Sequence, residues 1–523
     1  MACLSENVCI GRHYAGKRDA LSNIGEKVKR LTLRSVTDDF VFNLGTGVPD
    51  AAQQNMLKMP HYINEEDKSR LFFARFDGPL HWSGFDTVLQ LDAGIRSASL
   101  YINGSHVTKI ENTVLTALIR VDPYLRKKNS LYLRLDNNET DEDEIIRSLS
   151  LYHLPKSRVT DLLLRSHLDS GAANVFADIT VKAGDIGMAV GGSVIVSLLD
   201  GKMTVAETEM PIPAFKKNHW TSVRARLEIK SPRLWEPDDP HRYTALVQLF
   251  RADGTIADVR CFPFGVRELW LKPYDRRLKK EPCLLLNGKP VKIKGAVVKE
   301  QNANLPGRLR KMGFNAVRAV GFHNPKFFEA CETEGLLVMC ETKFRVYPNP
   351  KPRSRTKKDI LDPLERPFAM IGETVTRFQN NASIFCWSIG SRKMFGNEVL
   401  GEFIRSIDDT RAVNCERDFN FTISDFFSAS DCGTKELEAL STHKAVSIGG
   451  KYRWLLFSKY MHHPLLLCEV SYDRESIGEK LRAIETMDRF LGVFIDMGEF
   501  RSSISLKEVF GNRIPDSIEA AGG

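Results

Sequence analysis

Glu469 is well placed to do chemistry, because it directly follows the apolar run Leu465 to Cys468. A carboxylate at the end of a buried strand can act as a nucleophile or a general base when a second titratable group lies beside it. Glu341 ends another apolar run, and Asp496 follows a third. Without further context, each of the three is only an acidic residue at the end of a strand, where solvation alone explains it.

These acidic residues can meet only if the strands before them belong to one closed sheet. From about residue 270 to 523, apolar runs alternate with helical patterns, which predicts a (β/α)8 TIM barrel with all carboxyl strand ends at one face. Helices are expected at Pro325 to Glu334, where Asn324 is the predicted cap, and at Ser476 to Phe490. The eight expected strands are Val291–Val298, Ala316–Val320, Leu336–Cys340, Ile384–Ile389, Ala412–Cys415, Phe426–Phe427, Leu465–Cys468 and Leu491–Ile495.

Two blocks of short strands precede the predicted barrel. Residues 46–155 alternate and contain an Asn103-Gly104 turn, which predicts an antiparallel jelly-roll β-sandwich. Residues 156–269 are helix-poor, which is typical of a seven-stranded immunoglobulin-like β-sandwich. Residues 1–45 are expected to be an extension or a preliminary strand of the first domain, so the fold class is multidomain β plus α/β. The strands expected in the two sandwiches are Leu71–Phe76, Val88–Leu91, Ser97–Ile102, Leu131–Leu135, Val175–Val181, Val194–Leu199, Thr221–Ile229 and Tyr243–Phe250.

Composition excludes several classes of function. The net charge is +8 over 523 residues and is not gathered in one tail, so nucleic-acid binding is not favoured. No stretch approaches the roughly 20 apolar residues that span a bilayer, and no export signal is recognisable, which predicts a chain without membrane contact. The ten cysteines form no CxxC pair and indicate free thiols in a reducing, cytoplasmic compartment. No metal-ligand spacing or phosphate-binding loop is present, so neither a metal nor a cofactor is expected.

Several phrases, in the same order along the chain, resemble glycoside hydrolase family 2, which includes β-galactosidases, β-glucuronidases and β-mannosidases. The likeness covers about residues 46 to 505, and its most specific part is PRLWEPDDPHRY at Pro232 to Tyr243. The resemblance implies a sugar-binding jelly roll, an immunoglobulin-like sandwich and a catalytic barrel. The other matching phrases are Ala98–Gly104, Val121–Leu125, Phe264–Arg267, Leu286–Pro290, Gly313–Arg318, Trp387–Gly390 and Leu467–Glu469.

The resemblance assigns Glu469 the position of the catalytic nucleophile, but its acid/base partner is replaced. Retaining β-glycosidases need two carboxyl groups about 5 to 5.5 Å apart, one of them protonated. The family's acid/base glutamate follows Trp-Ser-x-Gly-Asn, and here Ser391-Arg392 stands in place of Asn-Glu. An arginine does not donate its proton at neutral pH. If Arg392 faces Glu469, the two are expected to form a charge-assisted pair. Asn397-Glu398 has the same two residue types as the family's acid/base pair, but it lies six positions later. In the first turn of the helix expected there, the helix dipole alone favours a glutamate.

Further candidates for substrate binding come from the same resemblance: Glu341, Glu300, Arg318, Trp387, His323 and Asp496. Glu341 matches the glutamate of the family's D-E-A-N motif, although it is also explained as a polar remnant or as a salt-bridge partner of Lys343 or Arg345. His323 is an uncertain counterpart of the family's histidine, and a lone loop histidine is more often exposed or caps the following helix. The family's aromatic platform after the eighth strand is replaced by Ile495 to Phe500.

After its first barrel strand the family has N-R-H-E, where this chain has Val297 to Glu300, so the histidine is replaced by Lys299. The loss of the acid/base, of this histidine and of the aromatic platform indicates a pseudo-β-glycosidase. Such a protein would bind a β-linked saccharide, or scaffold a protein partner or a second copy of itself. The alternative is a divergent retaining β-glycosidase that combines Glu469 with a relocated acid such as Glu341, Asp496 or Glu499. A third reading keeps the barrel as an interaction scaffold without any sugar contact, because a fold does not by itself confer function.

Overall fold

The computed structural model divides the chain into two compact units, one of 1–164, 175–228 and 243–263 and one of 165–174, 229–242 and 264–523. Each unit is described by itself. Within them, the structure describes residues 12–14, 28–32, 34–36, 54–56, 61–63, 70–78, 85–113, 116–136, 145–184, 186–272, 282–321, 323–342, 357–391, 396–418, 421–430, 465–471 and 490–496.

The first β-sandwich is organised by one long strand, β7 (Phe85–Ile102). Its first half pairs with β11 (Ile145–Pro155) and its second half with β10 (Lys128–Leu135). The two strands expected at Val88–Leu91 and Ser97–Ile102 are therefore one, because the polar residues between them continue the ladder. The turn at Asn103-Gly104 is confirmed, with φ of 52° and 84° at the two residues. The remaining strands are β2 (Val28–Arg30), β3 (Arg34–Val36), β4 (Gln54–Met56), β5 (His61–Tyr62), β6 (Leu71–Asp77), β8 (Ser105–Thr113) and β9 (Thr116–Arg120), with a 3-10 turn at Asp122–Tyr124.

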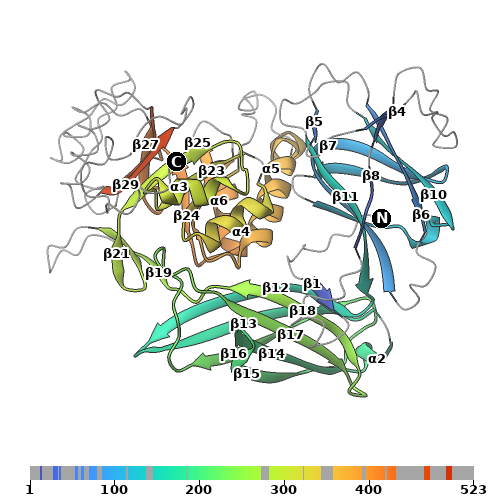
Figure 1. The fold of residues 1–523 in the computed structure, drawn as a ribbon, viewed down its shortest axis with the longest axis horizontal. Coiled ribbons are helices and arrows are strands. Elements are labelled where there is room, and N and C mark those ends of the chain that lie inside the picture. The colour runs from blue at the N-terminus through green and yellow to red at the C-terminus, as the bar shows by residue number, and fades with distance from the viewer. Residues whose placement is uncertain are drawn as a thin grey trace, which may run out of the picture. The chain divides into compact units, whose positions relative to one another are not determined.

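The second β-sandwich contains the seven strands expected of an immunoglobulin-like domain, in sheets of order β1-β18-β17-β14-β15 and β12-β13-β16 (Figure 1). The additional strand β1 comes from the amino-terminal extension and pairs with β18. Gly171, Gly201 and Gly254 have positive φ and lie in hairpin turns of this domain. The strands are β1 (Arg12–Tyr14), β12 (Arg158–Asp169), β13 (Ala172–Lys182), β14 (Gly192–Asp200), β15 (Met203–Ile212), β16 (Trp220–Ile229), β17 (Tyr243–Arg251) and β18 (Ile256–Phe264), with a short helix α2 (Ile186–Ala189).

The third domain contains eight parallel strands in the order β26-β25-β24-β23-β22-β29-β28-β27. All eight strands expected from the apolar runs are confirmed, with bounds shifted by at most three residues. They are β22 (Ile293–Val298), β23 (Ala316–Val320), β24 (Leu337–Glu341), β25 (Ile384–Ser391), β26 (Ala412–Glu416), β27 (Phe427–Ser430), β28 (Leu465–Ser471) and β29 (Phe490–Asp496), preceded by a small sheet of β19 (Leu269–Lys272), β20 (Cys283–Leu286) and β21 (Lys289–Val291).

The ring is closed between β26 and β27 by isolated hydrogen bonds instead of a ladder. The backbone N–H of Asp425 donates to Val413 O at 3.0 Å, and that of Arg417 donates to Ser428 O at 2.8 Å. The hydroxyl of Ser428 donates to Asn414 Oδ1 at 3.0 Å. The eight strands therefore form a nearly closed barrel whose carboxyl ends share one face.

Four helices cover the described part of the barrel: α3 (Leu305–Lys311), α4 (Pro325–Thr333), α5 (Lys357–Phe378) and α6 (Asn397–Ile407). The start of α4 is confirmed, because the side chain of Asn324 accepts the N–H of Lys326 at 3.1 Å. Glu398 lies in the first turn of α6, as expected. The helix expected at Ser476 to Phe490 falls almost entirely outside the described residues.

The PRLWEP phrase packs against the base of the barrel within the second unit. Trp235 is fully buried, and its indole N–H donates to Glu332 O at 2.9 Å. Gly335 has φ of 72°, and a Cβ there would lie 2.0 Å from Pro237 O, so no side chain fits. Few other residues would fit in place of this motif, because the space that it fills is closely packed.

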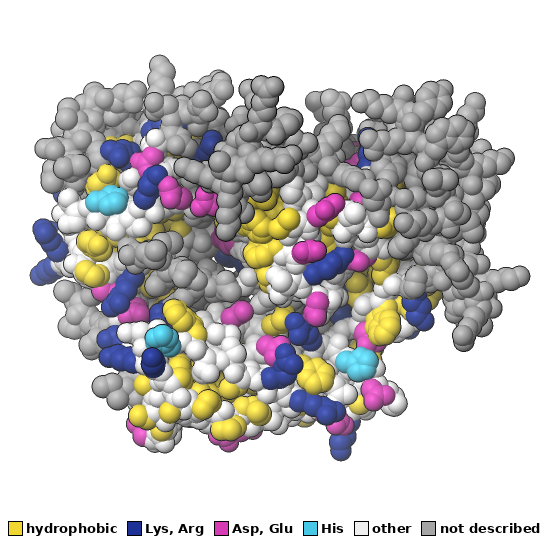
Figure 2. Space-filling model, turned by 180° about the vertical axis from the view of Figure 1, so that it is seen from behind, with side chains coloured by type: hydrophobic (Ala, Val, Ile, Leu, Met, Phe, Trp, Pro, Cys, Tyr) yellow, Lys and Arg dark blue, Asp and Glu magenta, His cyan; other side chains and the backbone are white. Residues whose placement is uncertain are grey.

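Charges of both signs are interspersed over the described part of the face shown in Figure 2. The seven cysteines that the structure describes are free thiols. Among the described helices, none is long and apolar enough to span a membrane.

Candidate active site at the carboxyl end of the barrel

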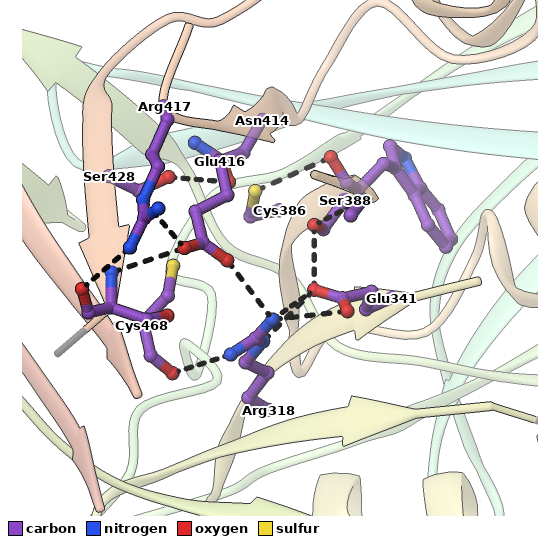
Figure 3. Close-up of polar contacts among 12 residues, drawn as sticks. Arg318, Glu341, Cys386, Ser388, Asn414, Glu416, Arg417, Ser428 and Cys468 are labelled. Carbon is purple, nitrogen blue, oxygen red and sulfur yellow. Dashed lines mark hydrogen bonds and ion pairs between the residues drawn. The ribbon is translucent and has the colours of Figure 1, made fainter. Parts of the chain in front are cut away.

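Arg318 is the centre of a buried polar cluster at the carboxyl end of the barrel (Figure 3). Its guanidinium binds Glu341 through Nε and Nη2, at 2.9 and 3.1 Å. Nη1 donates to the carbonyl oxygen of Cys468 at 2.8 Å, which ties β23 to β28. The hydroxyl of Ser388 on β25 donates to Glu341 at 3.0 Å. Two predicted residues, Arg318 and Glu341, are thus brought together.

The charge of Arg318 is balanced by acidic neighbours. Burial is the largest single influence and opposes the charged guanidinium, but the neighbouring groups together, with Glu341 the strongest of them, outweigh burial and raise the pKa of Arg318 above its ordinary value. Arg318 is 4% exposed and Glu341 is 7% exposed. Removing Arg318 would leave the buried carboxylate of Glu341 without its counterion.

Glu416 is a second carboxylate in this cluster, which the sequence reasoning missed. It ends β26, and its Oε2 lies 3.8 Å from Arg318 Nη2. Its Oε1 accepts the backbone N–H of Ser430 at 3.2 Å. Figure 3 shows Glu416 and Glu341 directed at the same guanidinium from different strands. The position of Glu416 directly after the apolar run Ala412–Cys415 was the same signal that identified Glu469.

Strands β25 and β28 each have an extra residue near their carboxyl ends. Between Ser388 and Ser391, β25 advances three residues while β26 advances two, and Gly390 in this interval has φ of 77°. Between Leu467 and Val470, β28 advances three residues while β29 advances two. Such bulges are common next to active sites, because they redirect the chain locally. Here they lie where the family resemblance places the two catalytic positions.

The side chains at both of these positions lie outside the described part of the structure. Glu469 is in β28, paired in register with Ser430, but its side chain is not among those described. Arg392, Lys343, Arg345 and Glu499 lie outside the described residues. The expected Arg392–Glu469 pair therefore stays a prediction. Glu341, for its part, has Arg318 as its salt-bridge partner.

Trp387 lies away from the Arg318 cluster. Its side chain is 2% exposed, and its indole N–H donates to Asp408 at 2.8 Å. Asp408 follows α6 and leads into the amino end of β26. This contact places the indole toward the opposite end of the strands from the cluster.

His323 is also separated from the cluster. It has no exposed surface, so the expectation of an exposed loop histidine is wrong. Its ring packs edge-on against Phe328 and Phe378. The ring nitrogens contact the side chains of Gln301 at 3.2 Å and Cys340 at 3.4 Å. The apolar neighbours on α4 and α5 explain its burial, and Asn324 caps the helix instead.

The remaining predicted residues lie at the rim. Asp496 ends β29 and pairs with Lys299 at 3.1 Å. Glu300 is exposed beside Lys299 in the turn after β22. Among the described residues, no group of three histidine, cysteine or acidic side chains could hold a metal ion.

Within the described cluster, Glu341 is engaged as a hydrogen-bond acceptor. Each interaction made by Glu341 uses its oxygens as acceptors, from Arg318 and Ser388. A general acid must instead carry a proton that it can release to a leaving group. The cluster thus resembles a binding site that has charge balance and fixed geometry.

A pair of sandwiches followed by a barrel with carboxylates at its carboxyl face defines a protein of the glycosidase type. The model for the family 2 TIM barrel domain of glycosyl hydrolases matches residues 277–496, and a second family 2 model matches residues 157–267. The chain belongs to glycosyl hydrolase family 2.

Solved structures show the same fold at low sequence identity. A family 2 member from Bacteroides cellulosilyticus aligns with a TM-score of 0.70 at 18% identity, over 90% of this chain and 64% of that chain. A β-glucuronidase from Bacteroides uniformis aligns with a TM-score of 0.71 at 16% identity, over 90% and 65%. A β-D-glucuronidase from Dictyoglomus thermophilum aligns with a TM-score of 0.67 at 17% identity, over 90% of each chain. The chain spans less than two thirds of the length of the two Bacteroides proteins.

Proposed function

We propose that this chain is a catalytically impaired family 2 protein that binds a β-linked saccharide at the carboxyl end of its barrel. The observation that carries the proposal is the replacement of the family's acid/base position by Arg392, together with the engagement of Glu341 by Arg318. General acid/base assistance is typically worth about 10² to 10⁴ in rate, so its loss leaves little turnover.

Binding is supported by what is retained. The bulges in β25 and β28, the Arg318–Glu341 pair and the polar carboxyl face all persist beside the replaced position. A barrel kept only as an interaction scaffold would not need charged groups at this face, because apolar packing fills a barrel at lower desolvation cost. The relatives named β-glucuronidases support a β-linked glycoside as the ligand class.

The test measures turnover of 4-nitrophenyl β-glucuronide, β-galactoside and β-mannoside by the wild type, Glu469→Gln and Arg392→Glu. We expect the wild type to be no faster than Glu469→Gln. Arg392→Glu should raise the rate about tenfold or more if that position is the main deficit. Wild-type turnover that Glu469→Gln abolishes would instead establish the divergent enzyme.

Binding is measured separately, as the shift in melting temperature with the hydrolysis-resistant methyl 1-thio-β-glycosides of the same three sugars. A ligand that binds only the folded state raises the melting temperature, and the rise grows with the logarithm of the ligand concentration once this exceeds the dissociation constant. A rise with at least one glycoside is expected. If none of the glycosides raised the melting temperature, the hypothesis that the barrel is an interaction scaffold without sugar contact would be favoured instead.

A further inference from the structure

Two buried polar atoms without a hydrogen-bond partner belong to Ser430 and Arg417, two residues that both contact Glu416. Of the buried side-chain atoms that the structure describes, Ser430 Oγ and Arg417 Nε are both unpartnered. Ser430 is 9% exposed, and its backbone links the other two residues: its N–H donates to Glu416 at 3.2 Å and its carbonyl accepts from Arg417 at 3.2 Å. Buried polar groups are usually satisfied, so an adjacent pair of exceptions requires an explanation.

The strand geometry directs Ser430 toward the interior of the barrel. Ser428 lies two residues earlier on β27, and its hydroxyl donates to Asn414 across the ring closure. Side chains two residues apart on a strand share a face, and the extra residue in this region lies on β28 rather than β27. Ser430 therefore shares the inner face of the ring with Ser428, one layer nearer the carboxyl end.

The missing hydrogen bonds define the chemistry of a ligand group. Arg417 Nε can only donate, a serine hydroxyl can donate and accept, and the carboxylate of Glu416 can only accept. Arg417 Nε lies 3.6 Å from Glu416 Oε1, within ion-pair range but beyond a hydrogen bond. An alcohol oxygen can accept two hydrogen bonds, from Arg417 Nε and from the hydroxyl of Ser430, and its O–H can donate one to Glu416, so a single hydroxyl group has the bonds that all three need.

The local charge favours a neutral group. Glu416 and Arg417 carry opposite charges, and Arg318 and Glu341 beside them do so too. A ligand carboxylate placed here would meet the carboxylate of Glu416, and two like charges in a site of low dielectric repel each other strongly. An uncharged hydroxyl avoids this repulsion.

We propose that Glu416, Arg417 and Ser430 form a subsite that binds an uncharged hydroxyl group of a β-linked sugar. The subsite rests on the proposed saccharide binding and deepens it. It predicts that uncharged β-hexosides bind more tightly than the β-glucuronide, although several proteins of similar fold are named β-glucuronidases.

The experiment measures by titration calorimetry the affinity for phenyl β-galactoside, β-glucoside, β-mannoside and β-glucuronide. The full chain is compared with Ser430→Ala, Arg417→Lys and the matched control Ser428→Ala. Ser430→Ala should weaken the best uncharged glycoside about fivefold, the size of one neutral hydrogen bond, without lowering the melting temperature of the free protein. Arg417→Lys, which removes the Nε donor and keeps the charge, should weaken it similarly. Ser428→Ala should show the opposite pattern, with a lower melting temperature and unchanged affinity.

The outcomes separate the two proposals. If the wild type binds a glycoside and Ser430→Ala binds it equally well, the subsite is wrong and saccharide binding stands. Tightest binding of the glucuronide would also overturn the subsite, since it assigns this place to a neutral group. Failure of the wild type to bind any of the four compounds would overturn both.

Discussion

In the described part of the barrel, one buried arginine network lies at each end of the strands, and the two differ in what the arginines bind. At the amino end, Arg267 and Arg411 both donate to the carbonyl oxygen of Ile384, and Arg411 pairs with Asp408 at 2.8 Å. At the carboxyl end, Arg318 binds the side chains of Glu341 and Glu416. The first network is directed mainly at the backbone and the second mainly at other side chains.

The amino-end network is saturated. Arg411 also donates to Asn381 O at 3.0 Å, and Asp408 accepts the indole N–H of Trp387. None of these side chains is among the unpartnered buried atoms of the described residues. Burial and the nearby charge of Arg411 lower the pKa of Arg267 to about 9. The two arginines nevertheless lie close together, because both bind the carbonyl oxygen of Ile384 at the start of β25.

The carboxyl-end network keeps unused hydrogen-bonding capacity at Ser430 and Arg417. A network that is complete and bound to the backbone stabilises the fold, whereas one with unpaired groups has a cost that a ligand can remove. This contrast agrees with the general difference between the two faces of barrel proteins, in which the amino face serves stability and the carboxyl face serves function.

The largest effect is expected from Asp408→Ala, which leaves the buried Arg411 without its counterion. Breaking a buried ion pair in this way costs about 3–5 kcal/mol of unfolding free energy. Urea denaturation followed by circular dichroism measures it. The neighbouring Asp409→Asn is the control, because Asp409 is 69% exposed in its pair with Arg165, and surface pairs contribute at most about 1 kcal/mol. Equal effects of the two variants would contradict a structural role for the amino-end network.

A smaller effect is expected from Glu341→Gln. The amide oxygen still accepts from Arg318, and Glu416 remains within 3.8 Å of it, so the loss should be about 1.5–3 kcal/mol. The same urea denaturation applies, with Glu398→Gln in the exposed first turn of α6 as the control. If Glu341→Gln lowered the free energy of unfolding more than Asp408→Ala does, the amino-end network would not be the more important of the two for stability.

The smallest effect is a pH dependence at the amino end. Burial alone would raise the pKa of Asp408, but Arg411 and the hydrogen bonds from Thr410 outweigh burial and lower it below its ordinary value. A depressed carboxyl pKa contributes stability that is complete above the unfolded-state value of about 3.9 and is lost as the pH falls through the folded-state value. The difference in unfolding free energy between the wild type and Asp408→Asn should therefore be constant above about pH 5 and shrink below about pH 4. A difference that stays constant down to pH 3 would refute this linkage.

The apolar runs of the sequence were sufficient to predict the eight barrel strands and their order along the chain. A short apolar run that alternates with helical patterns is typical of a buried parallel strand. Local chemistry was equally readable at Asn103-Gly104 and at the Asn324 cap, where neighbouring residues decide the conformation. The same local patterns predicted two strands where the structure has the single strand β7. Polar residues in the middle of a strand resemble a turn when the partner strand is unknown.

Only the tertiary structure decided which polar residues meet. Arg318 and Glu341 are 23 residues apart and Arg318 binds a carbonyl 150 residues away, so no local pattern specifies these bonds. The bulges in β25 and β28 depend on register with neighbouring strands, and the burial of His323 and Trp387 depends on helices packed outside the barrel. Long-range contacts of this kind arise from the closure of the ring, which brings the strand ends together regardless of their separation along the chain.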